Sequence, residues 1–249
     1  MQKPTCLQLK VHLAEIQSLF REFDLELGKV RETRQTEGLL KMQKEIEEKI
    51  EKLQKEFIPK EIREKIKDWQ NFYREVFQME IDFSHIKIPK KQEGFERLII
   101  MQKGLTVQRL FDKCAELFPT KNWMEGNLDE IVTSDRNASQ RAYAIWVREN
   151  VEADKELKNL SANDIAEKGI TAETLEERLL DEIKYFKQTG KHLDIANVTL
   201  CTGSRLSDSI VPSVGWSIDR LDAGSYGPDD RSDGLRARQV VSSSPKADK

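Results

Sequence analysis

The segment KHLD at 191–194 holds the residues of this sequence that are best placed for acid–base chemistry. Alternate side chains of an extended chain point the same way, so His192 and Asp194 would share one face. A nearby Cys201 or Ser204 could serve as a nucleophile beside this pair. The spacing therefore supports an alternative in which the protein is an enzyme of unfamiliar type.

The same segment has a structural interpretation, which we favour. Gly190, directly before it, is typical of the residue that ends a helix. The positive charges of Lys191 and His192 would offset the negative end of that helix's dipole. Spacing alone does not establish the geometry of a catalytic triad. We therefore expect a protein without enzymatic activity.

Other recognisable chemical motifs are missing from the sequence. It contains no glycine-rich phosphate loop, no HExxH, no nucleophile elbow and no CxxC pair. Its histidines, His12, His85 and His192, are too scattered to supply most metal sites. We expect no cofactor and no bound metal.

The acidic segment GPDDRSDG at 227–234 invites comparison with a calcium loop. When its last glycine is aligned with the sixth position of an EF-hand loop, Asp229 and Asp233 fit positions one and five. Arg231 then falls on position three, and Val240 falls where the bidentate glutamate is needed. The EF-hand is excluded, which leaves a looser calcium loop or an Asp-rich turn.

Residues 198–242 have the composition of a displayed contact surface. Short extended runs alternate there with turns rich in Gly, Ser and Asp, which offer adaptable hydrogen bonding. Trp, Tyr and Arg, the residue types that dominate binding hot spots, occur among them. The candidate ligand-binding residues are Arg205, Asp208, Trp216, Arg220, Tyr226, Asp230 and Arg231. An equally weighted alternative is that Trp216 and Tyr226 belong to the core of this segment.

A mixed scaffold must position these residues. The apolar run at 97–102 and the alternating run at 142–148 predict strands, and 198–242 predicts a small antiparallel sheet. Thr106 and Ser161 predict helix starts, and Thr171 or Thr174 opens a further helix that ends at Gly190. Strands and helices do not alternate regularly, so residues 80–242 are predicted to form an α+β domain. Residues 243–249 are predicted to be a disordered tail.

Residues 1–79 carry a different pattern. Apolar residues recur there with alternating spacings of three and four, which predicts a heptad-patterned helical arm or bundle. Gln43 occupies one position of the apolar seam and could fix its register. The helices could pack within one chain or pair between chains, so the protein could form a homo-oligomer.

Charge and cysteine content limit the environment and the partners. Lys and Arg number 41 against 44 Asp and Glu, for a net charge of -3, so we expect no nucleic-acid partner. No apolar run approaches the length of a membrane span, so we expect no membrane contact. Three widely spaced cysteines and an N-terminus without a secretory signal favour the cytoplasm.

Two resemblances follow from specific motifs. KGLTVQRLFDKC, AYAIWVR, LLDEIKYFKQTGKHLDI and LRAR resemble a family of uncharacterised proteins from uncultivated candidate-phylum bacteria, which implies no function. The motifs GSR at 203–205, PDDR at 228–231 and GLR at 234–236 are similar to those of C-type-lectin-like domains of the formylglycine-generating-enzyme type. Such domains occur in the variable proteins of diversity-generating retroelements. That likeness implies a rigid scaffold whose late surface residues bind ligands. The cysteine pair of the enzyme has no match, because Cys201 stands alone.

Three hypotheses result. The first is a non-enzymatic binding protein that presents a C-terminal surface to an unknown protein or other macromolecular ligand. The second is a structural or assembly protein that acts through its heptad helices. The third is the enzyme built on His192 and Asp194 with Cys201 or Ser204.

Overall fold

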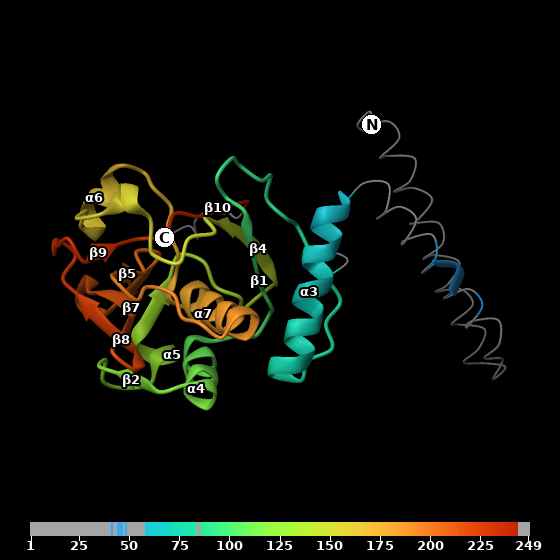
Figure 1. Ribbon diagram of the computed structural model, residues 1–249, viewed down its shortest axis with the longest axis horizontal. Coiled ribbons are helices and arrows are strands. Elements are labelled where there is room, and N and C mark those ends of the chain that lie inside the picture. Colours follow the sequence, from blue (N-terminus) through green and yellow to red (C-terminus); the bar gives the residue numbers. More distant parts are fainter. Residues whose placement is uncertain (1–40, 42–43, 47, 49–57, 84–85, 244–249) are drawn as a thin grey trace. The chain divides into compact units, whose positions relative to one another are not determined.

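The computed structural model describes residues 41, 44–46, 48, 58–83 and 86–243 (Figure 1). The chain divides into two compact units, Met1–Ile81 and Asp82–Lys249. Most of the predicted heptad positions, Gln43 and the tail beyond residue 243 lie outside the described residues. Within the described part, no helix has the length and apolar character needed to cross a bilayer.

The described helix of the first unit is α3, Lys60–Phe77. It starts after Pro59, whose fixed φ suits the entry to a helix, and ends at Gln78 in the left-handed conformation, with φ 56°. Its aromatic side chains are buried and contact one another, with Trp69 and Phe72 meeting edge to face at 5.1 Å. This helix follows the apolar spacing that the sequence shows from 62 to 76.

The second unit is a mixed α+β domain, as the sequence predicts. One of its sheets has the strand order β1, β4, β10, with antiparallel neighbours throughout. All five residues of β4 are buried, because both faces of the strand are covered. These three strands are Arg97–Met101, Tyr143–Val147 and Val241–Ser242. The strands predicted at 97–102 and 142–148 are confirmed.

The larger sheet has the order β2, β8, β7, β5, β9. Strands β7 and β8 form a hairpin, while β2 runs parallel to β8 and β9 runs parallel to β5. The sheet predicted to be antiparallel is therefore mixed, because β5 and β9 of the tail pair in parallel and β2, from residues 120–122, adds a second parallel pair at β8. The five strands are Thr120–Asn122, Arg220–Tyr226, Val211–Ser217, Val198–Leu200 and Leu235–Arg236. A separate ladder pairs β3, Val132–Ser134, with β6, Ser204–Leu206.

The helices of this domain begin at the residues that sequence rules favour. Thr106 caps α4 by accepting from the backbone N–H of Arg109, and Ser161 and Thr174 each form a capping box. Gly190 ends α7 with φ 67°. The helices are α4 Val107–Leu117, α5 Leu128–Ile131, α6 Ala162–Glu167 and α7 Leu175–Thr189, with short 3-10 turns at Lys155–Leu157 and Ser207–Ser209.

Helix α7 is the central element of the domain. It lies between β1 and β7 in Figure 1 and packs on both of them and on α4. The spacing of Leu175, Leu179, Ile183 and Phe186 in the sequence predicts a single buried apolar stripe along it, but every residue from Leu175 to Lys184 is buried, charged ones included. These ten residues are enclosed on all sides of the helix, so the polar ones among them must find partners inside the protein.

Candidate functional site

Asp194 is the centre of a buried ion network. It adopts a left-handed conformation with φ 54°, so the expected alternation with His192 does not hold. Its Oδ2 accepts from Arg178 Nε at 2.9 Å, and its Oδ1 accepts from Arg238 Nη2 at 2.7 Å. Thr199 Oγ1 and the backbone N–H of Ala153 also donate to this carboxylate. Burial alone would raise the pKa of Asp194, but the guanidinium groups of Arg238 and Arg178 outweigh it and lower the pKa.

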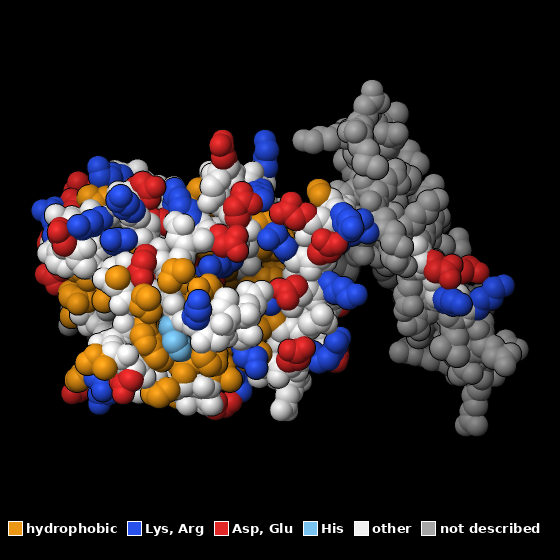
Figure 2. Space-filling view, viewed as in Figure 1, with side chains coloured by type: hydrophobic (Ala, Val, Ile, Leu, Met, Phe, Trp, Pro, Cys, Tyr) orange, Lys and Arg blue, Asp and Glu red, His pale blue; other side chains and the backbone are white. Residues whose placement is uncertain are grey.

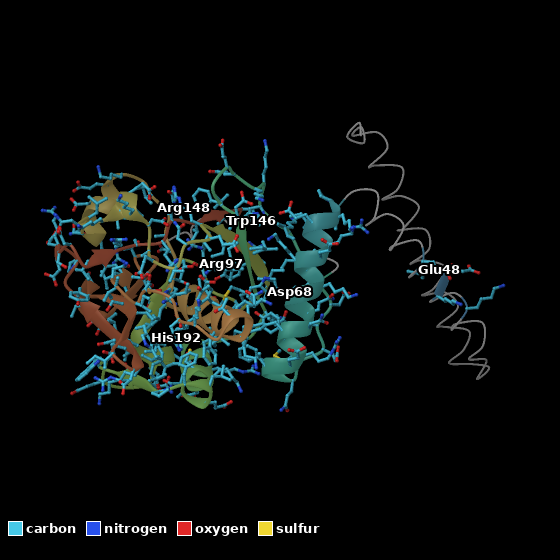
Figure 3. All side chains as sticks on the ribbon, viewed as in Figure 1. Glu48, Asp68, Arg97, Trp146, Arg148 and His192 are labelled. Carbon is cyan, nitrogen blue, oxygen red and sulfur yellow. The ribbon has the colours of Figure 1, made fainter. Side chains whose placement is uncertain are left out.

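His192 belongs to an aromatic stack. Its ring lies nearly parallel to that of Trp216, with centroids 3.3 Å apart, and it also stacks with Phe186 at a centroid distance of 5.0 Å. Its Nδ1 lies 2.9 Å from the Oε1 of the buried Glu182. Figure 2 shows hydrophobic side chains gathered around this histidine, which Figure 3 labels. The imidazole is therefore held by packing and by a carboxylate other than Asp194.

The two candidate nucleophiles also have structural surroundings. Cys201 is fully buried, and burial raises the pKa of its thiol well above the ordinary value, which disfavours the reactive thiolate. Ser204 Oγ accepts from the backbone N–H of Leu175 at 2.9 Å and lies 2.7 Å from Ser134 Oγ. Asp194, Cys201 and Ser204 are therefore buried in the protein interior, whereas His192 stays partly exposed within its aromatic stack.

The start of α7 carries further buried charges that sequence reasoning missed. Arg136 makes a bidentate ion pair with Glu177, and Arg97, labelled in Figure 3, pairs with Asp181 at 3.0 Å. Among the described residues, no arginine donates a hydrogen bond to Glu173 or Glu176, and burial raises the pKa of both, to about 7 for Glu176. The dense charge of TAETLEERLLDEIK was the available signal, but such runs usually lie on a solvated helix face.

The predicted contact residues of the tail do not form one surface. In the β7–β8 hairpin, Trp216 pairs with Leu221 and Ser217 pairs with Arg220, and directly paired residues share a face. Trp216 is therefore half-buried on the His192 side, while Arg220 lies on the opposite side of the sheet. The interpretation of Trp216 as a core residue is the one that its packing supports.

The side of the sheet that carries Arg220 presents a tryptophan that the sequence analysis did not select. Trp123, directly after β2, is 59% exposed and is tied to the sheet by its backbone N–H, which donates to the Ala223 carbonyl at 2.8 Å. Lys121 Nζ and Arg220 Cζ lie 5.0 Å and 5.8 Å from its ring centroid. Gly224 leaves room beneath the indole, since a Cβ there would lie 4.0 Å from Trp123 Cδ1.

We call this side of β8, with Lys121, Trp123, Arg220, Asp222 and Tyr226, the Trp123 face. Asp222 accepts from Arg220 Nε at 2.9 Å, and Tyr226 is 37% exposed at the end of the strand. Alternation along β8 places Arg220, Asp222 and Tyr226 on the same side. The only sequence signal for Trp123 was a lone indole in the turn-like stretch KNWME, beyond the segment that the composition singled out.

The remaining predicted residues have intramolecular partners or lie elsewhere. Asp230 accepts from the backbone N–H of Gly227, and Arg231 makes a bidentate pair with Asp164 at 2.7 Å. This pairing lowers the pKa of Asp164. Arg205 donates to backbone carbonyls beside a cavity under α6. The backbone of Asp208 lies in the 3-10 turn Ser207–Ser209, and its side chain is not part of the structure that is described.

The acidic loop 227–234 is tied to its neighbours through its carboxylates. Asp229 Oδ1 accepts from Asn163 Nδ2 at 2.7 Å, and Asp233 pairs with Lys158 at 3.1 Å. Over the described ranges, no group of three or more His, Cys, Asp or Glu side chains is arranged to hold a metal ion. Through these contacts the loop is held against α6 and the segment that precedes it.

Comparison with known proteins adds no relative: no family model, no curated protein and no solved structure matches this chain.

Proposed function

We propose that this protein is a non-enzymatic binding protein whose ligand-contacting surface is the Trp123 face of its α+β domain. The observation that carries the proposal is the exposed indole of Trp123, with the cations of Lys121 and Arg220 at 5.0 Å and 5.8 Å from its ring centroid. A rigid aromatic side chain makes a large contact at a small loss of conformational entropy on binding. Arg220 and Tyr226, two of the predicted contact residues, lie on the same face.

The hairpin tip beside this face supports the same conclusion. Ile218 is 97% exposed and has a positive φ of 56°, a conformation that is strained for a β-branched residue. Neither its exposure nor its backbone conformation contributes to folding stability, and strain of this kind is concentrated at functional positions. Ile218 lies two residues before Arg220, so an apolar hairpin tip lies next to the Trp123 face.

The chemistry of the face indicates its ligand class. An indole with Lys121 and Arg220 close to its ring favours a macromolecular ligand with an apolar or planar group next to acidic groups. The C-type-lectin-like resemblance fits this proposal, because it implies a rigid scaffold with a variable ligand-binding surface. Buried, free cysteines, Cys114 and Cys201, are compatible with the reducing cytoplasm that we propose as its location.

Glycan, peptide and protein arrays probed with the full chain test this proposal. We expect ligands whose binding falls by at least about tenfold in Trp123→Ala, as for a hot-spot tryptophan. The matched control is Ile195→Ala, which truncates an apolar residue of similar exposure, 61%, beside β7 on the side away from β8. Array ligands that bind Trp123→Ala as well as the unmodified chain, or an absence of any ligand, would refute the proposal.

The assembly role of the heptad helices stays a separate hypothesis, because those residues lie outside the described part of the chain. Light scattering of the full chain tests it, and a monomer would count against it.

A further inference from the structure

The domain contains a second candidate site, a cavity of about 170 Å³ beside α6. Helix α6 and the residues that follow it form one wall. The residues after β3 and the segment that leads into β6 form the other. In Figure 1, α6 lies at the opposite end of the domain from β2, so this cavity is distinct from the Trp123 face.

The wall from α6 is apolar. It consists of Ala162, Ile165, Ala166 and Ile170. Ile165 is buried, whereas Ala166 is exposed, so the wall runs from the protein interior to the surface. A short aliphatic group that entered the cavity would exchange water for this wall, which is favourable in proportion to the area covered.

The opposite wall carries two charges that do not pair with each other. Arg205 is half-buried, and its Nη1 donates to the carbonyls of Thr202 and Ser204 at 2.8 and 2.7 Å. Across the described ranges no carboxylate accepts from its remaining N–H groups, and the half-buried carboxylate of Asp135 makes no ion pair. Burial lowers the pKa of Arg205, and the charge of Asp135 opposes this effect only in part.

Arg136 in the same cavity shows the contrast. It is buried, and its guanidinium is satisfied by Glu177 Oε1 and Oε2 and by the Ala172 carbonyl at 2.7 Å. It therefore forms a fixed part of the wall and has no need of a ligand. Arg205 and Asp135, one charge of each sign, are the charged side chains of this cavity that make no ion pair within the described residues, although the charge of Asp135 acts on both arginines.

We propose that this cavity binds a small zwitterion with a short apolar substituent, namely a free α-amino acid of about the size of valine. The carboxylate of the ligand would meet Arg205, its ammonium would meet Asp135, and its side chain would lie against α6. Since a water molecule takes up about 30 Å³ in the liquid, the cavity has room for about six non-hydrogen atoms. The remaining atoms of valine, on its charged groups, would stay at the solvent-facing edge.

A ligand series separates the two charges. L-valine, isovalerate, which lacks the ammonium, and isobutylamine, which lacks the carboxylate, are titrated into the full chain and followed by ligand-observed NMR. We expect valine to bind at least about tenfold more tightly than either analogue, as one charge-assisted hydrogen bond allows. Equal binding of valine and isovalerate, or no binding of valine at about 50 mM, overturns the proposal.

Two variants locate the binding. Asp135→Asn should remove the advantage of valine over isovalerate, and Ala166→Leu should block the cavity from its exposed edge and abolish binding of every ligand. The control Ala115→Leu makes the same change at an exposed position of α4 and should leave the affinity unchanged. Valine binding that is unchanged in Ala166→Leu would place it elsewhere and refute the site. None of these outcomes bears on the Trp123 face.

Discussion

Glu176 offers a sharp test of the buried charge network. Its carboxyl lies at the start of α7 and accepts from Ser134 Oγ at 2.7 Å. Burial, opposed only in part by that hydrogen bond, raises its pKa from 4.5 to about 7. The folded protein therefore holds this proton over a pH range in which the unfolded chain has released it.

The direction and size of the effect follow from proton linkage. Between pH 4.5 and about 7 the native state binds one proton more than the unfolded state, so the free energy of unfolding falls as pH rises. The slope is about 1.4 kcal/mol per pH unit, which gives a loss of about 3 kcal/mol over the whole interval. Above the folded pKa the loss is complete and the contribution of Glu176 becomes constant.

Glu176→Gln should remove this dependence. Glutamine keeps an oxygen that can accept from Ser134 but carries no titrating proton. The amide does not titrate, so any effect it has on stability is the same at every pH. The test therefore uses only how the difference in free energy of unfolding between the variant and the unmodified chain changes with pH. The free energy of unfolding of the variant, relative to the unmodified chain, should rise by about 3 kcal/mol from pH 4.5 to pH 8.

The assay is urea unfolding at half-unit pH steps, with hydrogen exchange of the α7 amides as a local readout of the second unit. Glu125→Gln, at an exposed glutamate, is the control and should parallel the unmodified chain. Glu173, whose pKa is also raised, is present in every variant and cancels in the difference. Curves for Glu176→Gln and the unmodified chain that stay parallel within about 0.5 kcal/mol would refute the reasoning.

Three further predictions concern the same scaffold. Asp194→Asn should lower the free energy of unfolding by about 3–5 kcal/mol at pH 7, because it leaves Arg178 and Arg238 buried without their shared carboxylate; a loss below about 1 kcal/mol in urea unfolding would contradict this. Gly203→Ala should lower the free energy of unfolding by about 2 kcal/mol or more, because its Cβ would lie 2.9 Å from the Ala172 carbonyl. Gly224→Ala should be tolerated, because its Cβ would lie 3.6 Å from Ser213 Oγ. Trp216→Ala should cost about 3 kcal/mol through lost packing, and Trp123→Ala less than about 1 kcal/mol; equal losses in thermal unfolding would mean that the two indoles are not divided between core and surface.

The sequence was sufficient for the elements whose signals are local. The cap at Thr106, the helix end at Gly190 and the position of strand β4 depend on residues close in the chain, and each was predicted where it lies, although β4 is buried on both faces. Pairing over long distances was not predictable in this way. The parallel contact of β2 with β8 joins residues a hundred positions apart, and no local pattern encodes it.

The same distinction explains the outcome for the candidate site. Composition selected Trp216 and Arg220 together, because both lie in one short hairpin. Their assignment to opposite faces depends on register, and one residue of register reverses the face of every side chain. Trp123 was missed because it follows β2, and this strand lies far from the β7–β8 hairpin in the sequence although it pairs with β8. A surface assembled from two distant segments has no compositional signature.

The buried network gives a physical reason why the Trp123 face is free to serve as a binding surface. Asp194 connects Arg178 on α7, Arg238 near the C-terminus and the backbone at Ala153, so a single carboxylate joins segments that are distant in the chain. Lys121, Trp123 and Ile218 take no part in these contacts. Because these face residues are exposed or lie outside the buried network, substitutions at the face should alter ligand binding while the fold persists.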